Sequence, residues 1–178
     1  MTTLIRTSQE SDMSCLTAIY AHHVEHGSGS FELSAPNVQE MARRRTAVLE
    51  NGLPYLVAEV NGAVMGYAYA NLFRPRPAYR FLVENSVYID HTAQRLSLGR
   101  ALMAELIQRC EAQGARQMIA VIGDSANLGS IRLHQGLGFE HVGLIRSSGW
   151  KHQRWLDTVM MQRALGLGDL TTPKTETL

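Results

Sequence analysis

The sequence predicts a single α+β domain, a mixed α/β arrangement in which a mostly antiparallel twisted sheet carries helices on both faces. Two observations predict this fold class. The pair Asn61-Gly62 separates two runs of β-prone residues, a pattern typical of an antiparallel hairpin. An apolar run over 117–122 follows a helical pattern over 98–110, and a strand that is reached across a helix is typical of a parallel crossover.

The first half of the chain predicts an extended segment, two amphipathic helices and the two hairpin strands. In order, they are expected over 4–6, 13–24, 36–49, 55–60 and 63–70. Ser11 is the predicted N-cap of the first helix because its hydroxyl can accept from a free helical N–H. Pro36 suits the first turn of the second helix, which Asn51-Gly52 ends.

The second half predicts a strand, a long helix, a buried strand, a short helix and two terminal strands. They are expected over 85–89, 98–110, 117–122, 130–136, 141–146 and 157–162. The segment Arg74-Pro-Arg-Pro77 predicts a loop before them, since proline lacks the N–H that strand pairing requires. One domain is expected over residues 1–166, followed by a polar C-terminal tail over 167–178.

The composition excludes several classes of protein. Hydrophobic residues make up 45% and charged residues 19%, as in globular proteins. The 17 basic and 16 acidic residues leave a net charge of +1, so we expect neither nucleic acid nor a membrane as partner. No basic leader and no long apolar run is present, which predicts a cytoplasmic protein. Cys15 and Cys110 are expected to be buried, reduced thiols, and no metal is expected.

The stretch from Ser86 to Gly99 is the most informative part of the chain. A strand here leads through a turn into the long helix, so the N–H groups of the turn and of the first helical turn point together. Such an arrangement binds phosphate. The patterns GxxxxGK[ST] and GxGxxG are absent, which disfavours ATP and NAD. Taken alone, a strand, a loop and a helix with one glycine also fit an ordinary crossover.

The segment Gln94-x-x-Ser97-x-Gly99 resembles the Q/R-x-x-G-x-G/A pyrophosphate loop of the GCN5-related N-acetyltransferases. The resemblance covers residues 3–165 and looks closest to the phosphinothricin and methionine sulfoximine N-acetyltransferase branch. Other matching segments include Val83-Glu-Asn-Ser-Val-Tyr88, Ser130-Ile-Arg-Leu-His134 and Gly149-Trp-Lys-His152. It implies a sheet of about six to seven strands in which the parallel pair over 85–89 and 117–122 splays apart. It also implies acetyl-CoA as cosubstrate and a homodimer.

The resemblance further implies where the coenzyme binds. The expected residues come from the strand, the loop, the long helix and the start of the short helix: Val87, Tyr88, Ile89, Gln94, Arg95, Leu96, Ser97, Leu98, Gly99, Arg100 and Asn127. The backbone over 87–89 is expected to bond the pantetheine amides as a partner strand would. Ser97 replaces a glycine, so we expect a loop geometry that L-residues can adopt. Asn127 equally fits a plain helix N-cap.

Two residues are candidates for proton transfer. An ammonium must lose a proton before it attacks a thioester, and the departing thiolate benefits from gaining one. The resemblance implies Glu84 as general base, acting through a water, and His134 as acid or proton relay. The alternatives are a surface glutamate just before a strand and a half-covered helix histidine.

The acceptor site is predicted around the proline loop. Arg74 and Arg76 suit the α-carboxylate of an amino-acid-like amine, although solvated loop arginines fit equally. The expected acceptor-binding residues are Phe31, Arg74, Arg76, Tyr79, Asn85 and Ser86. The predicted activity is N-acetylation of a small amino-acid-like amine. Alternatives are another amine, such as a protein N-terminus, a polyamine or an aminoglycoside, and an acyl-CoA sensor without turnover. The aromatic segment 149–155 predicts a sheet edge or dimer contact.

Overall fold

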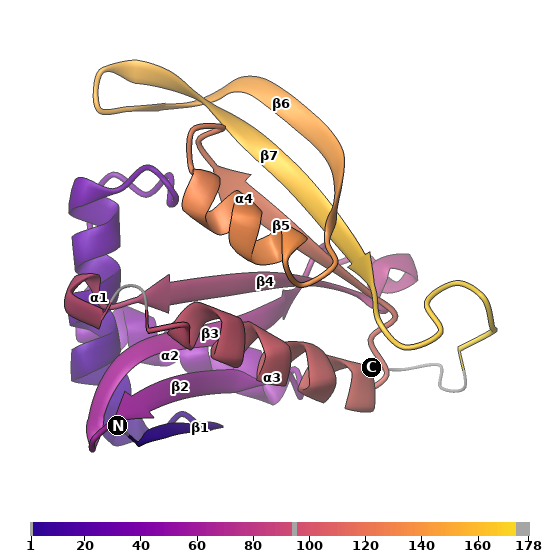
Figure 1. Ribbon diagram of the computed structural model, residues 1–178, viewed down its shortest axis with the longest axis horizontal. Coiled ribbons are helices and arrows are strands. Elements are labelled where there is room, and N and C mark those ends of the chain that lie inside the picture. The colour runs from indigo at the N-terminus through magenta and orange to yellow at the C-terminus, as the bar shows by residue number, and fades with distance from the viewer. Residues whose placement is uncertain (1, 94–95, 174–178) are drawn as a thin grey trace.

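The computed structural model describes residues 2–93 and 96–173, and within them seven strands form one sheet (Figure 1). The strands are Thr3–Thr7 (β1), Tyr55–Val60 (β2), Ala63–Leu72 (β3), Leu82–Ile89 (β4), Gln117–Gly123 (β5), Glu140–Lys151 (β6) and Arg154–Ala164 (β7). Their order is β1-β2-β3-β4-β5-β7-β6. All neighbours are antiparallel except β4 and β5, which are parallel, so the predicted fold class is confirmed.

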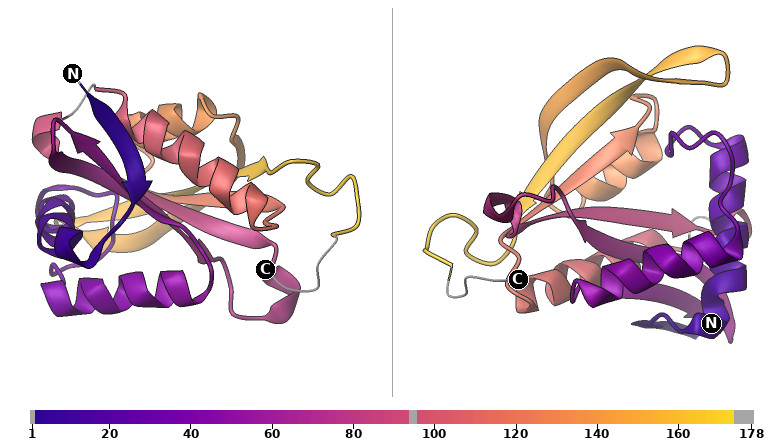
Figure 2. Two further views of the ribbon diagram at one scale, coloured as in Figure 1. Left: turned by 90° about the horizontal axis from the view of Figure 1, so that it is seen from below. Right: turned by 180° about the vertical axis from the view of Figure 1, so that it is seen from behind.

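Helices cover both faces of the sheet (Figure 2). They are Met13–His26 (α1), Val38–Glu50 (α2), Leu98–Ala112 (α3) and Leu128–Gln135 (α4). Helices α1 and α2 pack on one face of the first four strands, and α3 packs on the other. Helix α4 lies beside β5, on the same side as α3, where Leu133 comes close to Gly99.

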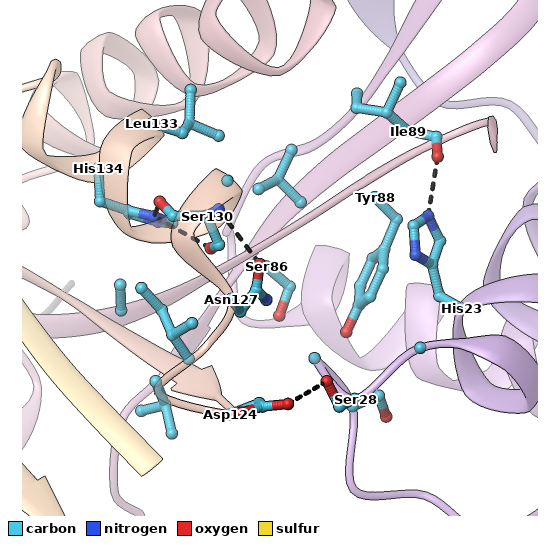
Figure 3. Close-up of a pocket in the computed structure, with 18 of the residues that line it drawn as sticks. His23, Ser28, Ser86, Tyr88, Ile89, Asp124, Asn127, Ser130, Leu133 and His134 are labelled. Atoms are coloured by element: carbon cyan, nitrogen blue, oxygen red, sulfur yellow. Dashed lines mark hydrogen bonds between the residues drawn. The ribbon is translucent and has the colours of Figure 1, made fainter. Parts of the chain in front are cut away.

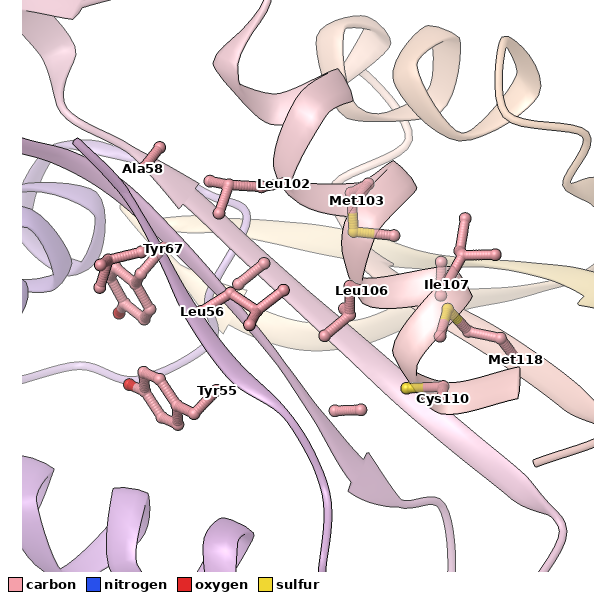
Figure 4. Packing of buried hydrophobic residues seen from close by; sticks show 14 of the residues in the cluster. Tyr55, Leu56, Ala58, Tyr67, Leu102, Met103, Leu106, Ile107, Cys110 and Met118 are labelled. Atoms are coloured by element: carbon pink, nitrogen blue, oxygen red, sulfur yellow. The ribbon is translucent and has the colours of Figure 1, made fainter. Parts of the chain in front are cut away.

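The main core lies between α3 and the first strands (Figure 4). Leu102 and Leu106 of α3 are fully buried against Leu56 of β2, as the helical spacing of apolar residues predicts. Full burial of one such leucine contributes roughly 1.5–3 kcal/mol relative to an exposed one. Tyr55 and Tyr67 project from the opposite face of the strands, toward α1 and α2.

The first helix begins at Met13 as predicted, but its predicted N-cap is wrong, and the second helix begins at Val38 rather than at Pro36. Helix α1 follows a 3₁₀ turn over Glu10–Asp12, so Ser11 is not its N-cap. The polar contacts at this helix start are made by the carboxylate of Asp12, which accepts from the Gln9 N–H at 2.7 Å and pairs with Arg6 at 2.8 Å. Helix α2 is capped by Asn37, whose side chain accepts from the Glu40 N–H at 2.9 Å, and Pro36 therefore lies before the helix.

The last two strands are longer than predicted and form one hairpin at the sheet edge. The serine and glycine residues over 147–149 indicate a turn by composition, but the structure absorbs them in a bulge, with Ser147 at a φ of 49°. Pairing then continues through Trp150 opposite Trp155 to Lys151 opposite Arg154. The prediction that segment 149–155 lies at a sheet edge is confirmed, since β6 is the outermost strand.

Both cysteines are free thiols, but only Cys110 is buried. Cys15 is exposed, so its predicted burial is wrong; its Sγ lies 3.3 Å from the Val64 carbonyl oxygen of β3. The start of the predicted tail is held to the domain, because Arg116 donates to the carbonyl oxygens of Gly168 and Thr171. Within the described ranges, no helix has the length and apolar character needed to span a membrane.

Candidate active site

The parallel strands β4 and β5 pair only at their beginnings. The ladder runs from Leu82 opposite Gln117 to Asn85 opposite Ala120, and beyond it the strands diverge. The backbone over Ser86–Ile89 therefore has no strand neighbour on its β5 side. The opening contains a cavity of about 450 Å³, which is lined by residues of β4, β5, α4 and the segment Gly27–Ser30 (Figure 3). The predicted splay of the parallel pair is confirmed.

Two buried side chains hold the strands together where the ladder stops. Asn85 is 6% exposed, and its Nδ2 donates to the Ile119 carbonyl oxygen at 3.0 Å. Its Oδ1 lies 2.9 Å from Nε2 of His134, which is 2% exposed. A side-chain bridge thus takes over from backbone pairing at the apex of the opening.

The surroundings of His134 set two opposing influences on its protonation. Its Nδ1 lies 2.8 Å from the Ser130 carbonyl oxygen, and its Nε2 faces Oδ1 of Asn85, whose amide nitrogen already donates to Ile119. A ring with a proton on each nitrogen donates to both oxygens. Burial lowers the pKa of His134, and the bond to Ser130 opposes that change. Because both ring nitrogens are engaged within the protein, the geometry favours positioning of Asn85 over proton transfer.

The phosphate cradle was predicted at the start of α3. Gln94 and Arg95 lie outside the described residues, and Leu96 is exposed. The N–H groups of Leu98, Gly99 and Arg100 belong to the first helical turn, where they have no carbonyl partner within the helix. A Cβ atom at Gly99 would lie 3.3 Å from the Leu133 side chain, so glycine allows α3 and α4 to approach closely.

Ser97 precedes α3 with a φ of 58° and a ψ of 15°, in the left-handed region. The prediction of a geometry that L-residues can adopt therefore holds only in part. Serine can take this conformation, but it costs roughly 1–2 kcal/mol that glycine would avoid.

The predicted pantetheine edge lies along the cavity. Val87, Tyr88 and Ile89 all line it, although the Ile89 carbonyl oxygen already accepts from Nε2 of His23 at 2.8 Å. Asn127 also lines the cavity, and its side chain caps α4 by accepting from the Ser130 N–H at 3.3 Å. Its two alternative roles are therefore compatible.

Glu84 was predicted to lie just before a strand, but it lies within β4, which begins at Leu82. It is half-buried and does not itself line the cavity. Residues two apart on a strand share a face, so Glu84 projects on the same face as Ser86, which does line it. Burial raises the pKa of Glu84, and the positive charge of Arg74 opposes that rise.

Most of the predicted acceptor residues lie away from this cavity. Arg74, Arg76 and Tyr79 are exposed on the loop between β3 and β4, and none of them lines it. The Phe31 ring packs against the backbone of Gly149, where a Cβ atom would lie 2.5 Å from it. Asn85 points toward α4, as described above. Asn85 and Ser86 are the predicted acceptor residues that line the cavity.

Sequence reasoning missed the carboxylate of Asp124, which lines the cavity and is 4% exposed. It has a φ of 70° and accepts from Ser28 Oγ at 2.7 Å and from Arg154. Burial alone would raise the pKa of Asp124, but these two bonds hold it below the ordinary value. The sequence feature that could have pointed to Asp124 is its position directly after the apolar run of β5. No cluster of three His, Cys, Asp or Glu side chains suited to a metal ion occurs among the described residues.

Comparison with known proteins identifies the family. The family described as acetyltransferase (GNAT) domain matches residues 5–160. Phosphinothricin N-acetyltransferase of Alcaligenes faecalis is 50% identical over 170 residues, covering 96% of this chain and 86% of that protein. An L-methionine sulfoximine/L-methionine sulfone acetyltransferase of Salmonella typhimurium is 36% identical over 161 residues, covering 90% of this chain and 94% of that protein.

Solved structures agree with the sequence matches. A GNAT superfamily phosphinothricin acetyltransferase from Sinorhizobium meliloti, in complex with AcCoA, superposes with a TM-score of 0.94 and 48% identity, covering 98% of this chain and 94% of that chain. An N-acetyltransferase from Staphylococcus aureus Mu50 gives a TM-score of 0.90 and 31% identity, covering 93% and 100%. The match to the family over residues 5–160 agrees with the opened β4–β5 pair of the structure. The chain therefore belongs to the GNAT acetyltransferase family.

Proposed function

We propose that the protein transfers an acetyl group from acetyl-CoA to the amine of a small amino-acid-like substrate of the phosphinothricin, methionine sulfoximine or methionine sulfone type. The observation that carries the proposal is the opening between β4 and β5, with Gly99 in the first turn of α3 close to Ile89 at the end of β4. The named activities of relatives at 50% and 36% identity support this acceptor class.

The residues present fit the coenzyme. The free backbone edge over Ser86–Ile89 suits an extended chain of amides laid beside it. The unpaired N–H groups at Leu98–Arg100, together with the positive end of the helix dipole, suit a diphosphate. Acetyl-CoA supplies a thioester whose C–S bond breaks as the new C–N bond forms.

Glu84 is the proposed base. The substrate amine arrives as an ammonium ion and must lose a proton before its lone pair can attack. A carboxylate whose pKa is raised by burial holds a proton more readily than an exposed one, which suits it to this task. Its place on the same face as Ser86 supports transfer through one water.

A panel of amines tests the function. The purified protein is mixed with acetyl-CoA and with methionine sulfone, methionine sulfoximine, phosphinothricin, spermidine or an aminoglycoside, and thiol release is followed. We expect turnover with one or more of the first three. Turnover with the polyamine or aminoglycoside alone would move the acceptor to another class. Binding of acetyl-CoA in calorimetry without thiol release from any amine would indicate a sensor, and no binding would refute the proposal.

We further propose that residues 1–166 form a single domain and that the protein works in the cytoplasm. We also propose that it forms a homodimer through its outer strand. The homodimer is supported by the exposed apolar side chains of the β6–β7 hairpin: Val142, Leu144, Ile145, Trp150 and Trp155. A long edge strand with such residues readily pairs with another chain. Light scattering should give twice the monomer mass, and Leu144→Lys should yield monomers. A monomeric wild type would refute this part.

A further inference from the structure

A second cavity, of about 200 Å³, lies between the sheet and α2. It shares no lining residue with the cavity between β4 and β5. Its walls are mainly aromatic and aliphatic: Tyr20, Met41, Val48, Tyr55, Tyr67 and Tyr69. Arg44 also lines it, but its guanidinium already donates to Glu32 and Glu40.

One fully buried polar atom of a lining residue has no hydrogen-bond partner in the described part of the chain. Tyr67 is 0% exposed, and its hydroxyl oxygen makes no hydrogen bond to any described residue. A buried hydroxyl without a partner is destabilising and uncommon in native proteins. Burial holds the pKa of Tyr67 well above its ordinary value, so the group keeps its proton and acts as a donor. The described residues supply a donor here but no acceptor for it.

The strand register connects this cavity to the proposed base. In the antiparallel pair β3 and β4, Tyr69 lies opposite Ser86 and Asn71 lies opposite Glu84. Residues opposite each other project from the same face, with Cα atoms about 4.5–5.5 Å apart. Asn71 lines the cavity and is exposed, so the part of the cavity wall at Asn71 lies next to Glu84. An amine held near Glu84 therefore has this cavity within reach of its side chain.

We propose that this cavity binds the side chain of the acceptor, with the Tyr67 hydroxyl donating to an oxygen of its tetrahedral phosphinate, sulfone or sulfoximine group. The inference rests on the proposed function, since it assumes an amino-acid-like acceptor. The aromatic and aliphatic walls suit the methylene and methyl groups of such a side chain, and the unpartnered Tyr67 hydroxyl suits its oxygen.

The variant Tyr67→Phe tests the inference because it removes the hydroxyl and keeps the ring. Methionine sulfone is the substrate, and norleucine, whose side chain has no oxygen, is the competitor. We expect the KM for methionine sulfone to rise about tenfold, as for a lost hydrogen bond to a buried group. The inhibition constant of norleucine and the KM for acetyl-CoA should stay unchanged. The melting temperature should not fall, since the removed hydroxyl bonds to none of the residues that the structure describes.

A second variant, Val48→Ile, adds one methylene to the cavity wall and should raise both the KM for methionine sulfone and the inhibition constant of norleucine. The subsite is refuted, while the proposed function stands, if Tyr67→Phe shifts the KM for methionine sulfone and the inhibition constant of norleucine equally. It is also refuted if the variant shifts neither constant. If Val48→Ile changes neither constant, the side chain binds elsewhere. If the wild type binds acetyl-CoA but acetylates none of the amino-acid-like amines, the proposed function fails, and this inference fails with it.

Discussion

Nε2 of His134 lies 2.9 Å from Oδ1 of Asn85 at the point where β4 and β5 separate. Through Asn85, helix α4 is linked to the Ile119 carbonyl oxygen of β5. The width of the opening is therefore set by a chain of buried side-chain contacts as well as by the sheet. Substitutions here should affect coenzyme binding and stability together.

Replacement of His134 by alanine should lower the free energy of unfolding by about 1–3 kcal/mol, because Asn85 Oδ1 would remain buried without a partner. The KM for acetyl-CoA should rise in parallel. Urea denaturation and initial rates measure the two effects. His134→Gln, which keeps an amide donor, should recover part of both. A large loss of kcat with unchanged stability and KM would instead support proton transfer by His134.

The stability of the protein should depend on pH through the same residue. Since burial lowers the pKa of His134 from 6.5, the unfolded chain binds a proton on this residue at a higher pH than the folded chain does. Its contribution is complete above about pH 6.5 and is lost as the pH falls toward the folded pKa. Urea midpoints of the wild type should therefore fall more steeply below that pH than those of His134→Gln. Identical slopes would contradict the prediction.

Glu84→Gln should lower kcat by roughly 10²–10⁴ and leave acetyl-CoA binding unchanged, because the amide cannot take up the proton of the ammonium. Burial raises the pKa of Glu84 above 4.5, so the wild-type rate should fall on the acidic side at a pH above that value. The variant should lack this acidic limb. Stopped assays across a range of pH measure the rates of the wild type and the variant. Glu140→Gln, a substitution of an exposed glutamate, is the control. Wild-type activity in Glu84→Gln would remove the residue from the mechanism.

Ser97→Gly should stabilise the protein by up to about 1 kcal/mol, since glycine accepts a φ of 58° without strain but adds entropy to the unfolded chain. Ser97→Ala keeps the strain and removes the hydroxyl, so it serves as the control for phosphate contact. Thermal unfolding and the KM for acetyl-CoA separate the two effects. A lower melting temperature for the glycine variant would show that the loop does not carry this strain.

The fold was largely predictable because it depends on local patterns. The turn at Asn61-Gly62 has positive φ at both residues, 49° and 87°, as the pair predicts. The apolar stripe of α3 and the two-sided burial of β5 also follow from spacing alone. The ends of β6 and β7 could not be predicted from spacing, because the bulge near Ser147 depends on pairing across the hairpin.

The site was predictable where it consists of backbone and a short motif, as at Val87–Ile89 and the start of α3. It was not predictable where distant side chains meet. His134 and Asn85 are 49 residues apart, and nothing local to either indicates their contact. The alternating tyrosines of β2 and β3 suit ordinary strands, so their common cavity becomes visible only when α2 is packed over them.

The short ladder between β4 and β5 divides the sheet into two blocks, β1–β4 and β5–β7, joined by four residue pairs. Such a seam is a natural line of bending. A coenzyme laid along it would bridge both blocks and stiffen the molecule as a whole, so backbone amides far from the ligand should exchange with deuterium more slowly once it is bound.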